Sequence, residues 1–558
     1  MEYRSEKIIN GNPNCKALLK SMGYSEEELG HQPRIGIADT WNELAPGHHN
    51  LRQVAEYVRR GIYAAGGTAC EFGTIAICDG VAQSHIGMNY VLPSREIIAN
   101  SVEAMVQGHQ LDGLVALASC DKIIPGMLLA AARLDIPFIL INGGPMLGGP
   151  VTDGRKADGT SITEALGRCL AGTCSQEEAE NLVTTACPGC GSCSFMGTAN
   201  TMGCLAEALG MTLTGAADIP AVYAQRFEKA FETGKKIVEL TNRGITARQI
   251  ITKESIENAI RVCLSIGGST NAVLHLSALA IEAGIDMNVL QAFKRLNKIT
   301  PQLASVNPNS KWNTEDYYFA GGTPRVMQNM GDMLHLNVMT ANGCTLGEAL
   351  PKARYFYAPN PEVITTVERP FSPTGGIAVM EGNLAPKTGI SKPSAIAPEM
   401  HHFVGKAICF NCEEDAYQAA ESGKIKPGHV VVIRYEGPKG GPGMREMCLV
   451  LKLLHGMGLA SSTALVTDGR FSGTNNGCFV GHISPEAAEG GPIALVEDGD
   501  EIMIDVDTEQ LELHVDEATL AERRKKWAAP KKNIPNGYLR MYAKAASSAD
   551  MGAAIIND

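Results

Sequence analysis

The sequence predicts an α/β protein in two parts: a mostly parallel α/β domain at residues 1–350 and a β-rich, barrel-like domain at residues 376–558, joined by a linker at 351–375. Three observations support this. The chain has 558 residues, enough for more than one hydrophobic core. Apolar strand-like runs alternate with helical patterns across residues 34–145, as in a parallel sheet. After the proline-rich linker, short β-type runs alternate with glycine-rich turns, as in a barrel.

The first half contains four strand candidates, which are short apolar runs that end at polar or glycine-rich loops. Segments with helical periodicity lie between them. We expect strands at 34–38, 71–78, 113–118 and 136–141, and helices at 51–65, 95–108 and 127–134. We also expect a helical lead-in arm at 1–33, a helix at 196–210 and a helical region at 219–285.

The second half is marked by runs of valine, isoleucine and leucine that glycine-rich turns separate. A tail that is helical and initially basic follows them. We expect strands at 430–434, 464–467, 493–496, 501–506 and 512–515, and helical structure within 520–558.

The composition limits the classes of function. The net charge is −12, which gives no electrostatic support for binding nucleic acid or an anionic membrane surface. There is no run of 18 apolar residues and no visible secretory signal, so we expect a cytoplasmic protein that does not enter a membrane. In such a reducing compartment the 16 cysteines indicate metal binding, catalysis or core packing rather than disulfides.

One tripeptide, Cys120-Asp121-Lys122, follows the apolar run 113–118 and precedes a helical segment. Ligands bind beyond the carboxyl ends of parallel strands, which is where this tripeptide is expected. A thiolate favours soft metals such as cluster iron, whereas a carboxylate favours Mg²⁺. The tripeptide therefore indicates two different metal centres that meet, although a surface Asp–Lys pair beside a buried cysteine explains it equally well.

Three further cysteines, Cys187, Cys190 and Cys193, form C-P-G-C-G-S-C. This spacing resembles half of a bacterial ferredoxin motif, but no fourth cysteine followed by proline completes it. A tetrahedral zinc site would also need a fourth ligand. Together with Cys120, the segment is expected to supply at least one ligand of an iron–sulfur cluster, while the remaining thiols pack in the core.

Two acids and a cation are placed where loops follow strands. Asp79 ends the strand predicted at 71–78, and Glu446 lies in a glycine-rich segment that must approach another group closely. Arg470 precedes Ser472 in a loop after the strand at 464–467, and together they offer a cation and a hydroxyl to a substrate carboxylate. Each of these residues can also be a solvated surface or turn residue.

Taken together, these segments resemble the dihydroxy-acid dehydratase and phosphogluconate dehydratase family, and the match extends over nearly the whole chain. The motifs are C-D-K-x2-P-G at 120–126, T-A-N-T at 198–201, G-G-S-T-N at 267–271, Y-E-G-P-K-G-G-P-G-M-R-E-M at 435–447 and T-D-G-R-F-S-G at 467–473. The resemblance implies a hydro-lyase that dehydrates a 2,3-dihydroxy carboxylic acid to a 2-keto-3-deoxy acid with an iron–sulfur cluster and Mg²⁺.

The resemblance also implies roles for individual residues. It places Cys120 and Cys193 on the cluster and identifies Ser472 as the base that removes the C2 proton. Ser192 and Arg470 are expected to bind the substrate, a small carboxylate. The implied Mg²⁺ ligands are Asp79, Asp121, Glu446 and a carbamylated Lys122.

One position departs from the family pattern. Members with a first-loop cluster cysteine carry it in a T-P-C-N context, where this chain has Gly47. Cys78 is our candidate for the third thiolate; His48, Cys190 or no protein ligand are the alternatives. The departure leaves 2Fe–2S and 4Fe–4S clusters both possible, and it favours sugar acids over 2,3-dihydroxy-3-methylbutanoate as substrate.

Two alternatives stay open, and the first is favoured by the chain length and the C-terminal domain, which look closer to the dihydroxy-acid dehydratase branch. The chain can instead be the dihydroxy-acid dehydratase of branched-chain amino-acid biosynthesis. It can also be a non-catalytic iron–sulfur electron carrier or sensor that has kept the fold. The resemblance further implies a homodimer or homotetramer.

Overall fold

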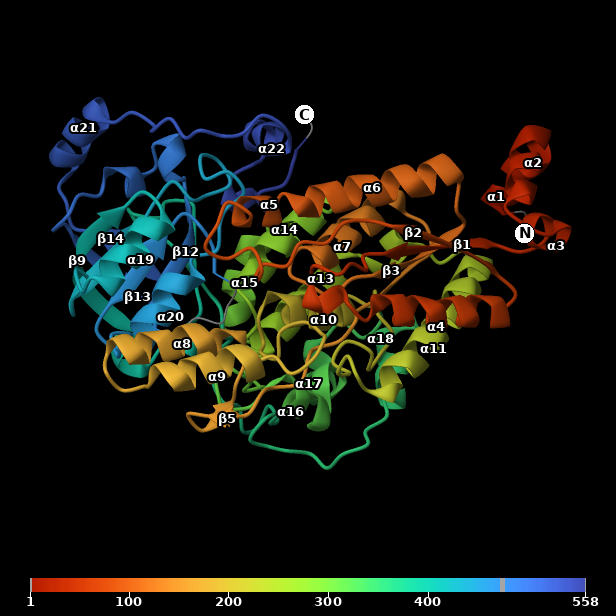
Figure 1. Ribbon diagram of the computed structural model, residues 1–558, viewed down its shortest axis with the longest axis horizontal. Helices are drawn as coiled ribbons and strands as arrows, with labels where there is room; N and C mark the ends of the chain where they lie inside the picture. The colour runs from red at the N-terminus through yellow and green to blue at the C-terminus, as the bar shows by residue number, and fades with distance from the viewer. Residues whose placement is uncertain (1–2, 472–476, 557–558) are drawn as a thin grey trace.

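A four-stranded parallel sheet forms the centre of the first half of the molecule, in the order β2-β1-β3-β4. The computed structural model describes residues 3–471 and 477–556. The helices between these strands cover the sheet, and the lead-in helices lie at the far edge (Figure 1). The strands are β1 (Arg34–Asp39), β2 (Thr68–Gly73), β3 (Gly113–Leu117) and β4 (Phe138–Ile141).

The helices of the first half confirm the alternating pattern. The lead-in helices are α1 (Arg4–Gly11), α2 (Pro13–Ser21) and α3 (Glu26–Gly30), and the helices between the strands are α4 (Leu51–Ala64), α5 (Met88–Val91), α6 (Ser94–His109) and α7 (Ile123–Leu134). After β4 a small hairpin, β5 (Val151–Thr152) and β6 (Arg155–Lys156), precedes α8 (Gly159–Leu170), α9 (Gln176–Thr185) and α10 (Thr198–Ala208).

The region predicted to be helical at 219–285 consists of several helices rather than one. It contains α11 (Ala224–Arg243), α12 (Ala247–Ile250), α13 (Lys253–Ser265) and α14 (Asn271–Glu282), followed by α15 (Val289–Asn297), α16 (Thr314–Phe319), α17 (Gly322–Met330) and α18 (Leu346–Ala349). No helix or strand lies between Lys352 and Ala378. The domain limits themselves stay a prediction.

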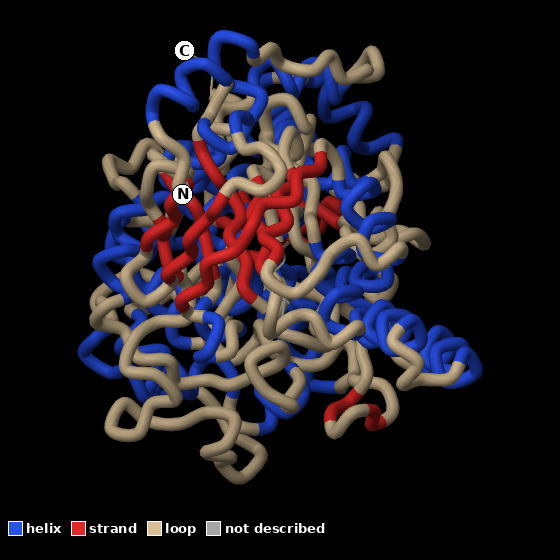
Figure 2. The backbone as a smooth tube through the Cα atoms, turned by 90° about the vertical axis from the view of Figure 1, so that its left-hand side faces the viewer, coloured by secondary structure: helices blue, strands red, loops and turns tan. Residues whose placement is uncertain are grey.

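The second half is built on an eight-stranded mixed sheet in the order β14-β13-β9-β10-β11-β12-β8-β7. Its strands face the viewer in Figure 2. The backbone of Glu381, next to β7, bonds to Glu509 and Leu511 at β14, so the two edges meet and the sheet is nearly closed. The strands are β7 (Ala378–Met380), β8 (Thr388–Ser391), β9 (His402–Phe410), β10 (His429–Ile433), β11 (Ala464–Thr467), β12 (Cys478–Ser484), β13 (Glu501–Asp505) and β14 (Gln510–Leu513).

Alternation along the barrel strands explains their burial. In β10, Val430 and Val432 face the barrel interior, whereas Val431 and Ile433 face the opposite side. This period of two follows from the pleat of a strand. The outward residues pack against the helices that cover the barrel, so both faces of this strand are apolar. The helices of this half are α19 (Glu413–Glu421), α20 (Cys448–Gly456), α21 (Glu517–Lys526) and α22 (Tyr538–Ala545).

Two strand predictions were wrong in position or type. The strand expected at 71–78 is β2 at 68–73, because its pairing with β1 runs from Arg34 to Asp39 and stops there, leaving 74–78 as a loop. The apolar run expected as a strand at 493–496 is a 3₁₀ turn, Pro492–Leu495. Proline at the start of that run has no N–H to donate to a strand ladder.

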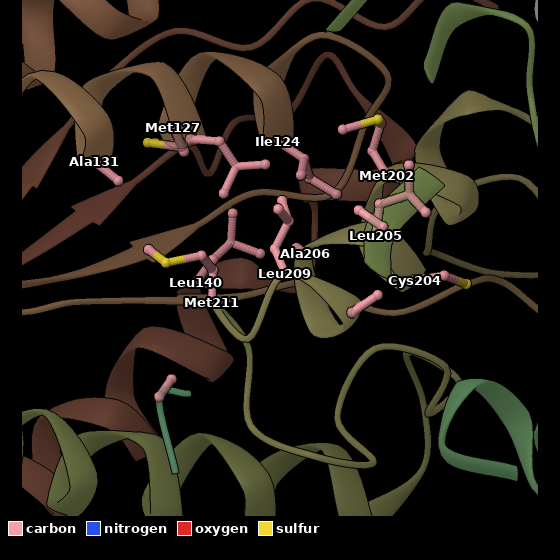
Figure 3. Packing of buried hydrophobic residues seen from close by; sticks show 14 of the residues in the cluster. Ile124, Met127, Ala131, Leu140, Met202, Cys204, Leu205, Ala206, Leu209 and Met211 are labelled. Atoms are coloured by element: carbon pink, nitrogen blue, oxygen red, sulfur yellow. The ribbon is translucent and has the colours of Figure 1, made fainter. Parts of the chain in front are cut away.

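The core beneath the first sheet fixes the two segments that carry the predicted cluster cysteines. Ile124 and Met127 of α7 lie opposite Leu140 of β4 and residues of α10, including Met202 and Leu205 (Figure 3). Helix α7 begins directly after Cys120-Asp121-Lys122, and α10 begins shortly after Cys193. Packing of these two helices therefore sets the distance between the two segments.

Two helix pairs approach each other through glycine. A Cβ atom on Gly234 of α11 would lie 2.1 Å from the Val58 carbonyl oxygen of α4, and one on Gly456 of α20 would lie 2.2 Å from the Glu164 carbonyl oxygen of α8. Backbone atoms cannot move aside as a side chain can. Glycine is therefore required for the close contact in both pairs, and the second pair joins the two halves of the chain (Figure 1).

None of the helices among the described residues is long and apolar enough to cross a membrane.

We expect Gly234→Ala to destabilise the protein by about 1–3 kcal/mol, because the added methyl group forces α11 away from α4. Thermal unfolding followed by circular dichroism should show a lower midpoint. Gly108→Ala in α6 is the matched control: its Cβ would meet nothing within 4 Å, so a stability equal to or above that of the parent is expected. Equal midpoints for the two variants would contradict the close contact.

Candidate active site

The site lies where the loops after β1, β2 and β3 meet a glycine-rich segment of the second half. Cys78 and Asp79 come from the loop after β2, and Asp121 comes from the loop after β3. Glu446 approaches from the segment before α20 and pairs with Arg470 through a backbone bridge. Parallel strands place their carboxyl-end loops at one edge of a sheet, which is the usual position of a ligand site.

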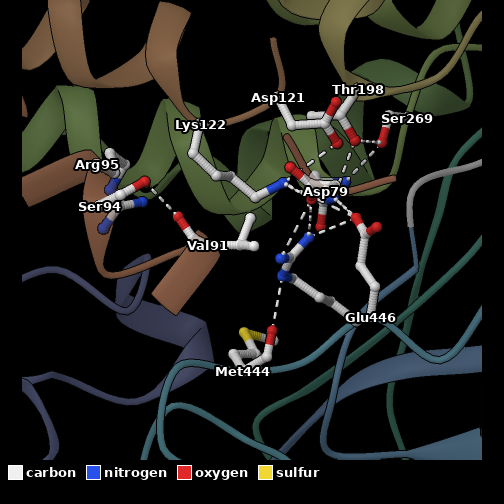
Figure 4. Close-up of polar contacts among 12 residues, drawn as sticks. Asp79, Val91, Ser94, Arg95, Asp121, Lys122, Thr198, Ser269, Met444 and Glu446 are labelled. Atoms are coloured by element: carbon white, nitrogen blue, oxygen red, sulfur yellow. Dashed lines mark hydrogen bonds and ion pairs between the residues drawn. The ribbon is translucent and has the colours of Figure 1, made fainter. Parts of the chain in front are cut away.

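Three buried carboxylates, those of Asp79, Asp121 and Glu446, form the centre of the site (Figure 4). Each offers an oxygen within 4.8 Å of the others. The Lys122 ammonium lies among them, with Nζ at 3.0 Å from Asp79 Oδ2, 3.2 Å from Asp121 Oδ2 and 3.8 Å from Glu446 Oε1. Lys122 is fully buried, and these three carboxylates are its ion-pair partners.

A second cation comes from the second half of the chain. The Arg470 guanidinium donates to Glu446 Oε1 and, at 3.4 Å, to Asp79 Oδ2, while its Nε donates to the Met444 carbonyl oxygen at 2.6 Å. These contacts direct its charge to the carboxylates. A direct contact of Arg470 with substrate stays a prediction.

The donor set suits a hard cation. With Asp79, Asp121 and Glu446 ionised, Lys122 and Arg470 leave one net negative charge in a buried volume. Asp79 Oδ1 is buried without a hydrogen-bond partner among the described residues. Burial raises the pKa of Asp79 and of Asp121, so a bound cation would stabilise their ionised forms. The three carboxylates can therefore hold a metal ion of the Mg²⁺ type.

Three thiols converge beside the carboxylates. The neighbouring Cys120 thiol lowers the pKa of Cys78, and Cys78 in turn raises that of Cys120. Burial, and then the nearby Cys78, raise the pKa of Cys193. Burial disfavours the charged thiolate forms, and bonds to a soft metal would stabilise them. All three line one cavity of about 320 Å³, together with Asp79, Asp121 and Glu446.

Gly47 lies directly against this cluster of thiols. A Cβ atom at position 47 would be 2.6 Å from Cys120 Sγ. The position at which a cysteine was expected is therefore next to the thiols, although glycine supplies no ligand.

His48 has both ring nitrogens occupied. Its Nε2 accepts from the Cys120 backbone N–H at 3.2 Å, and its Nδ1 lies 2.7 Å from Thr40 Oγ1, whose own proton goes to the Leu117 carbonyl oxygen. Burial lowers the pKa of His48 to about 3, so the ring is neutral. As an iron ligand, His48 would have to give up one of these bonds.

The remaining predicted site residues differ in their positions. Ser192 lines the cavity and donates to Asn200 Oδ1 at 2.8 Å. Cys187 also lines it, whereas Cys190 is not among the described residues that do. Ser472 lies outside the described residues.

Sequence reasoning missed a polar network that supports Glu446. The Asn271 side chain donates to Glu446 Oε1 at 3.0 Å and to Thr198 Oγ1 at 2.9 Å, and Thr198 in turn lies 2.8 Å from Ser269 Oγ. The motifs G-G-S-T-N and T-A-N-T contain these residues, so the signal was present without a role attached to it. The network fixes one oxygen of Glu446 relative to the carboxylates of Asp79 and Asp121.

Comparison with known proteins gives the family. Residues 32–349 match the family model described as Dihydroxy-acid/6-phosphogluconate dehydratase N-terminal, and residues 362–553 match the corresponding C-terminal model. Similar proteins named dihydroxy-acid dehydratase occur in Syntrophobacter fumaroxidans (50% identical, covering 97% of this chain and 96% of that protein) and in Pyrococcus abyssi (50% identical, covering 99% of each). Another is that of Caldanaerobacter subterraneus (48% identical, covering 99% of each).

These full-length matches agree with the arrangement of carboxylates and thiols around one cavity. The chain belongs to the dihydroxy-acid/6-phosphogluconate dehydratase family and is a hydro-lyase that acts on a dihydroxy acid.

Proposed function

We propose that this hydro-lyase dehydrates 2,3-dihydroxy-3-methylbutanoate or a close branched analogue to the corresponding 2-keto acid, in branched-chain amino-acid biosynthesis. The observation that carries the proposal is the apolar wall of the cavity, formed by side chains that include Met146, Ile162, Phe195 and Leu449. Methyl groups suit such a wall, whereas the extra hydroxyls of a sugar acid would lose hydrogen bonds to water there.

The relatives support the same choice. Those described above are named dihydroxy-acid dehydratase, and they match this chain over nearly its full length. The preference for sugar acids that followed from Gly47 is therefore replaced by the branched-acid alternative. The alternative of a non-catalytic electron carrier or sensor is wrong, because the chain is a hydro-lyase of a dehydratase family.

In this proposal Asp79, Asp121 and Glu446 hold Mg²⁺, and Cys78, Cys120 and Cys193 hold the iron–sulfur cluster. When bound, the two groups supply Lewis-acid character at the substrate carboxylate and C2 hydroxyl and at the departing C3 hydroxyl. Carbamylation of Lys122, which the family resemblance implies, would replace its ammonium charge with an anionic oxygen, so the bound cation would then supply the charge compensation that the ammonium supplies in its absence.

The chain's own groups have three tasks. The Arg470 guanidinium offsets part of the carboxylate charge, and its charge lowers the pKa of Asp79 and of Asp121 against the larger effect of burial. The apolar wall excludes water from C3 and orients the methyl groups. Ser472 removes the proton from C2, with Ser192 positioned on the cavity wall to bind the substrate.

A substrate panel tests the reaction. Anaerobically reconstituted enzyme with Mg²⁺ should form a 2-keto acid, detected as its phenylhydrazone, with a higher kcat/KM for 2,3-dihydroxy-3-methylbutanoate than for gluconate or xylonate. A higher kcat/KM for the aldonates would contradict the branched-acid assignment. Turnover of none of them by cluster-loaded protein would contradict the proposed reaction.

Asp79→Asn should weaken Mg²⁺ binding, because it removes one of the negative charges that hold the ion. With less Mg²⁺ to stabilise the charge that develops on the substrate, kcat should fall by on the order of 100-fold or more. Calorimetric titration with Mg²⁺ provides a readout independent of turnover. The exposed Asp332→Asn variant is the control and should leave both quantities unchanged. Unaltered Mg²⁺ affinity in the Asp79 variant would remove this residue from the ligand set.

Cys78→Ser should lose most of the iron that the parent protein binds, whereas Cys190→Ser should retain it, since Cys78 lines the cavity beside Cys120. Iron and sulfide are counted per chain after anaerobic purification. The number of iron atoms per chain in the parent protein distinguishes a 2Fe–2S from a 4Fe–4S cluster. A full cluster in Cys78→Ser would show that another group is the third ligand.

A further inference from the structure

Two cysteines that the proposed chemistry does not use, Cys169 and Cys174, meet at the end of α8. The chain reverses there: the Gly172 N–H bonds to the Cys169 carbonyl oxygen at 3.0 Å, and the Thr173 N–H bonds to the Arg168 carbonyl oxygen at 2.9 Å. Gly172 has φ of +75°, which glycine adopts without strain. The turn therefore brings Cys174 back alongside the last turn of the helix.

The two thiols share one acceptor. Cys169 Sγ and Cys174 Sγ each lie 3.4 Å from the Ser175 carbonyl oxygen. The two sulfur atoms therefore cannot be farther apart than the sum of these two distances. Both side chains are only partly buried, so a small reagent can reach them. Both cysteines are unpaired in this structure.

We infer that Cys169 and Cys174 are a redox modification site, at which the two thiols are oxidised to an intramolecular disulfide by a low-molecular-weight disulfide such as glutathione disulfide. One cysteine thiolate attacks the small disulfide, forms a mixed disulfide and releases one small thiolate. The second cysteine thiolate attacks the protein sulfur of that bond and releases the second. The protein loses two electrons and two protons, and the small disulfide is reduced to two thiols.

The location gives the modification a route to the active site. The first turns of α8 supply Ile162 and Thr163 to the cavity wall, and Glu164 of the same helix accepts from Lys452 Nζ at 2.7 Å. The thiol pair lies at the opposite end of this helix. A disulfide between them would link the end of α8 covalently to the turn that leads into α9. This inference does not depend on which acid the enzyme dehydrates.

The rate of oxidation should rise with pH. Partial burial, the neighbouring Cys169 thiol and the Glu178 carboxylate raise the pKa of Cys174. Less of its thiol is therefore ionised at neutral pH, and the thiolate is the reactive form.

Peptide mapping tests the inference on the intact holoenzyme. The protein is equilibrated anaerobically with glutathione and glutathione disulfide at several ratios, quenched with acid, alkylated and cleaved after glutamate. The peptide at 165–177 contains Cys169 and Cys174 and no other cysteine. With increasing oxidant it should lose two hydrogens and take up no alkyl group, and a dithiol reductant should restore two alkylated cysteines.

Serine variants supply the control. In Cys169→Ser the remaining Cys174 should accumulate as a mixed disulfide with glutathione, because no second thiol is present to release it. Cys344, which has a similar partial exposure, should show no such loss of hydrogens in the parent. Two alkyl groups on the 165–177 peptide at every ratio, or two separate glutathione adducts, would overturn the inference.

Discussion

The balance of charge around Asp79, Asp121 and Glu446 is the constraint on which the rest of the site depends. Three carboxylates cannot be buried together without compensation, and Lys122 and Arg470 supply most of it. The two cations come from different halves of the chain, Lys122 from the start of α7 and Arg470 from the loop after β11. The site is therefore complete only when both halves are folded against each other, and the close contact of α8 with α20 contributes to that docking.

Sequence patterns predicted the features of the fold that depend on interactions between residues close together in the chain. Strands β1, β3 and β4 are buried over their whole length, and the tripeptide after β3 lies where the thiols and the carboxylates meet. The position of β2 was wrong because strand limits depend on the neighbour with which a strand pairs. The prediction of a strand at 493–496 was wrong because the apolar, partly β-branched composition of the run favours a strand, whereas Pro492 before it favours a turn.

Long-range contacts account for most of what was missed at the site. Asn271 and Glu446 are far apart in sequence, and no periodicity relates them, yet the amide fixes one oxygen of the carboxylate. The donation from Arg470 to the carboxylates of Asp79 and Glu446 was likewise not predicted, and its expected contact with the substrate stays a prediction. A motif can indicate that a residue matters; the direction in which its side chain points depends on the fold. Ser472, outside the described residues, keeps the role that its motif predicts.

Gly47 restricts how such a centre can change over time. Any side chain at this position must displace the Cys120 sulfur, which is itself enclosed by protein. A cysteine gained at 47 while Cys78 is retained would thus disturb an existing thiol before it could add a new one. A side chain at 47 and the Cys120 sulfur in its present position therefore exclude each other, so the two arrangements of thiols cannot be combined unless Cys120 moves.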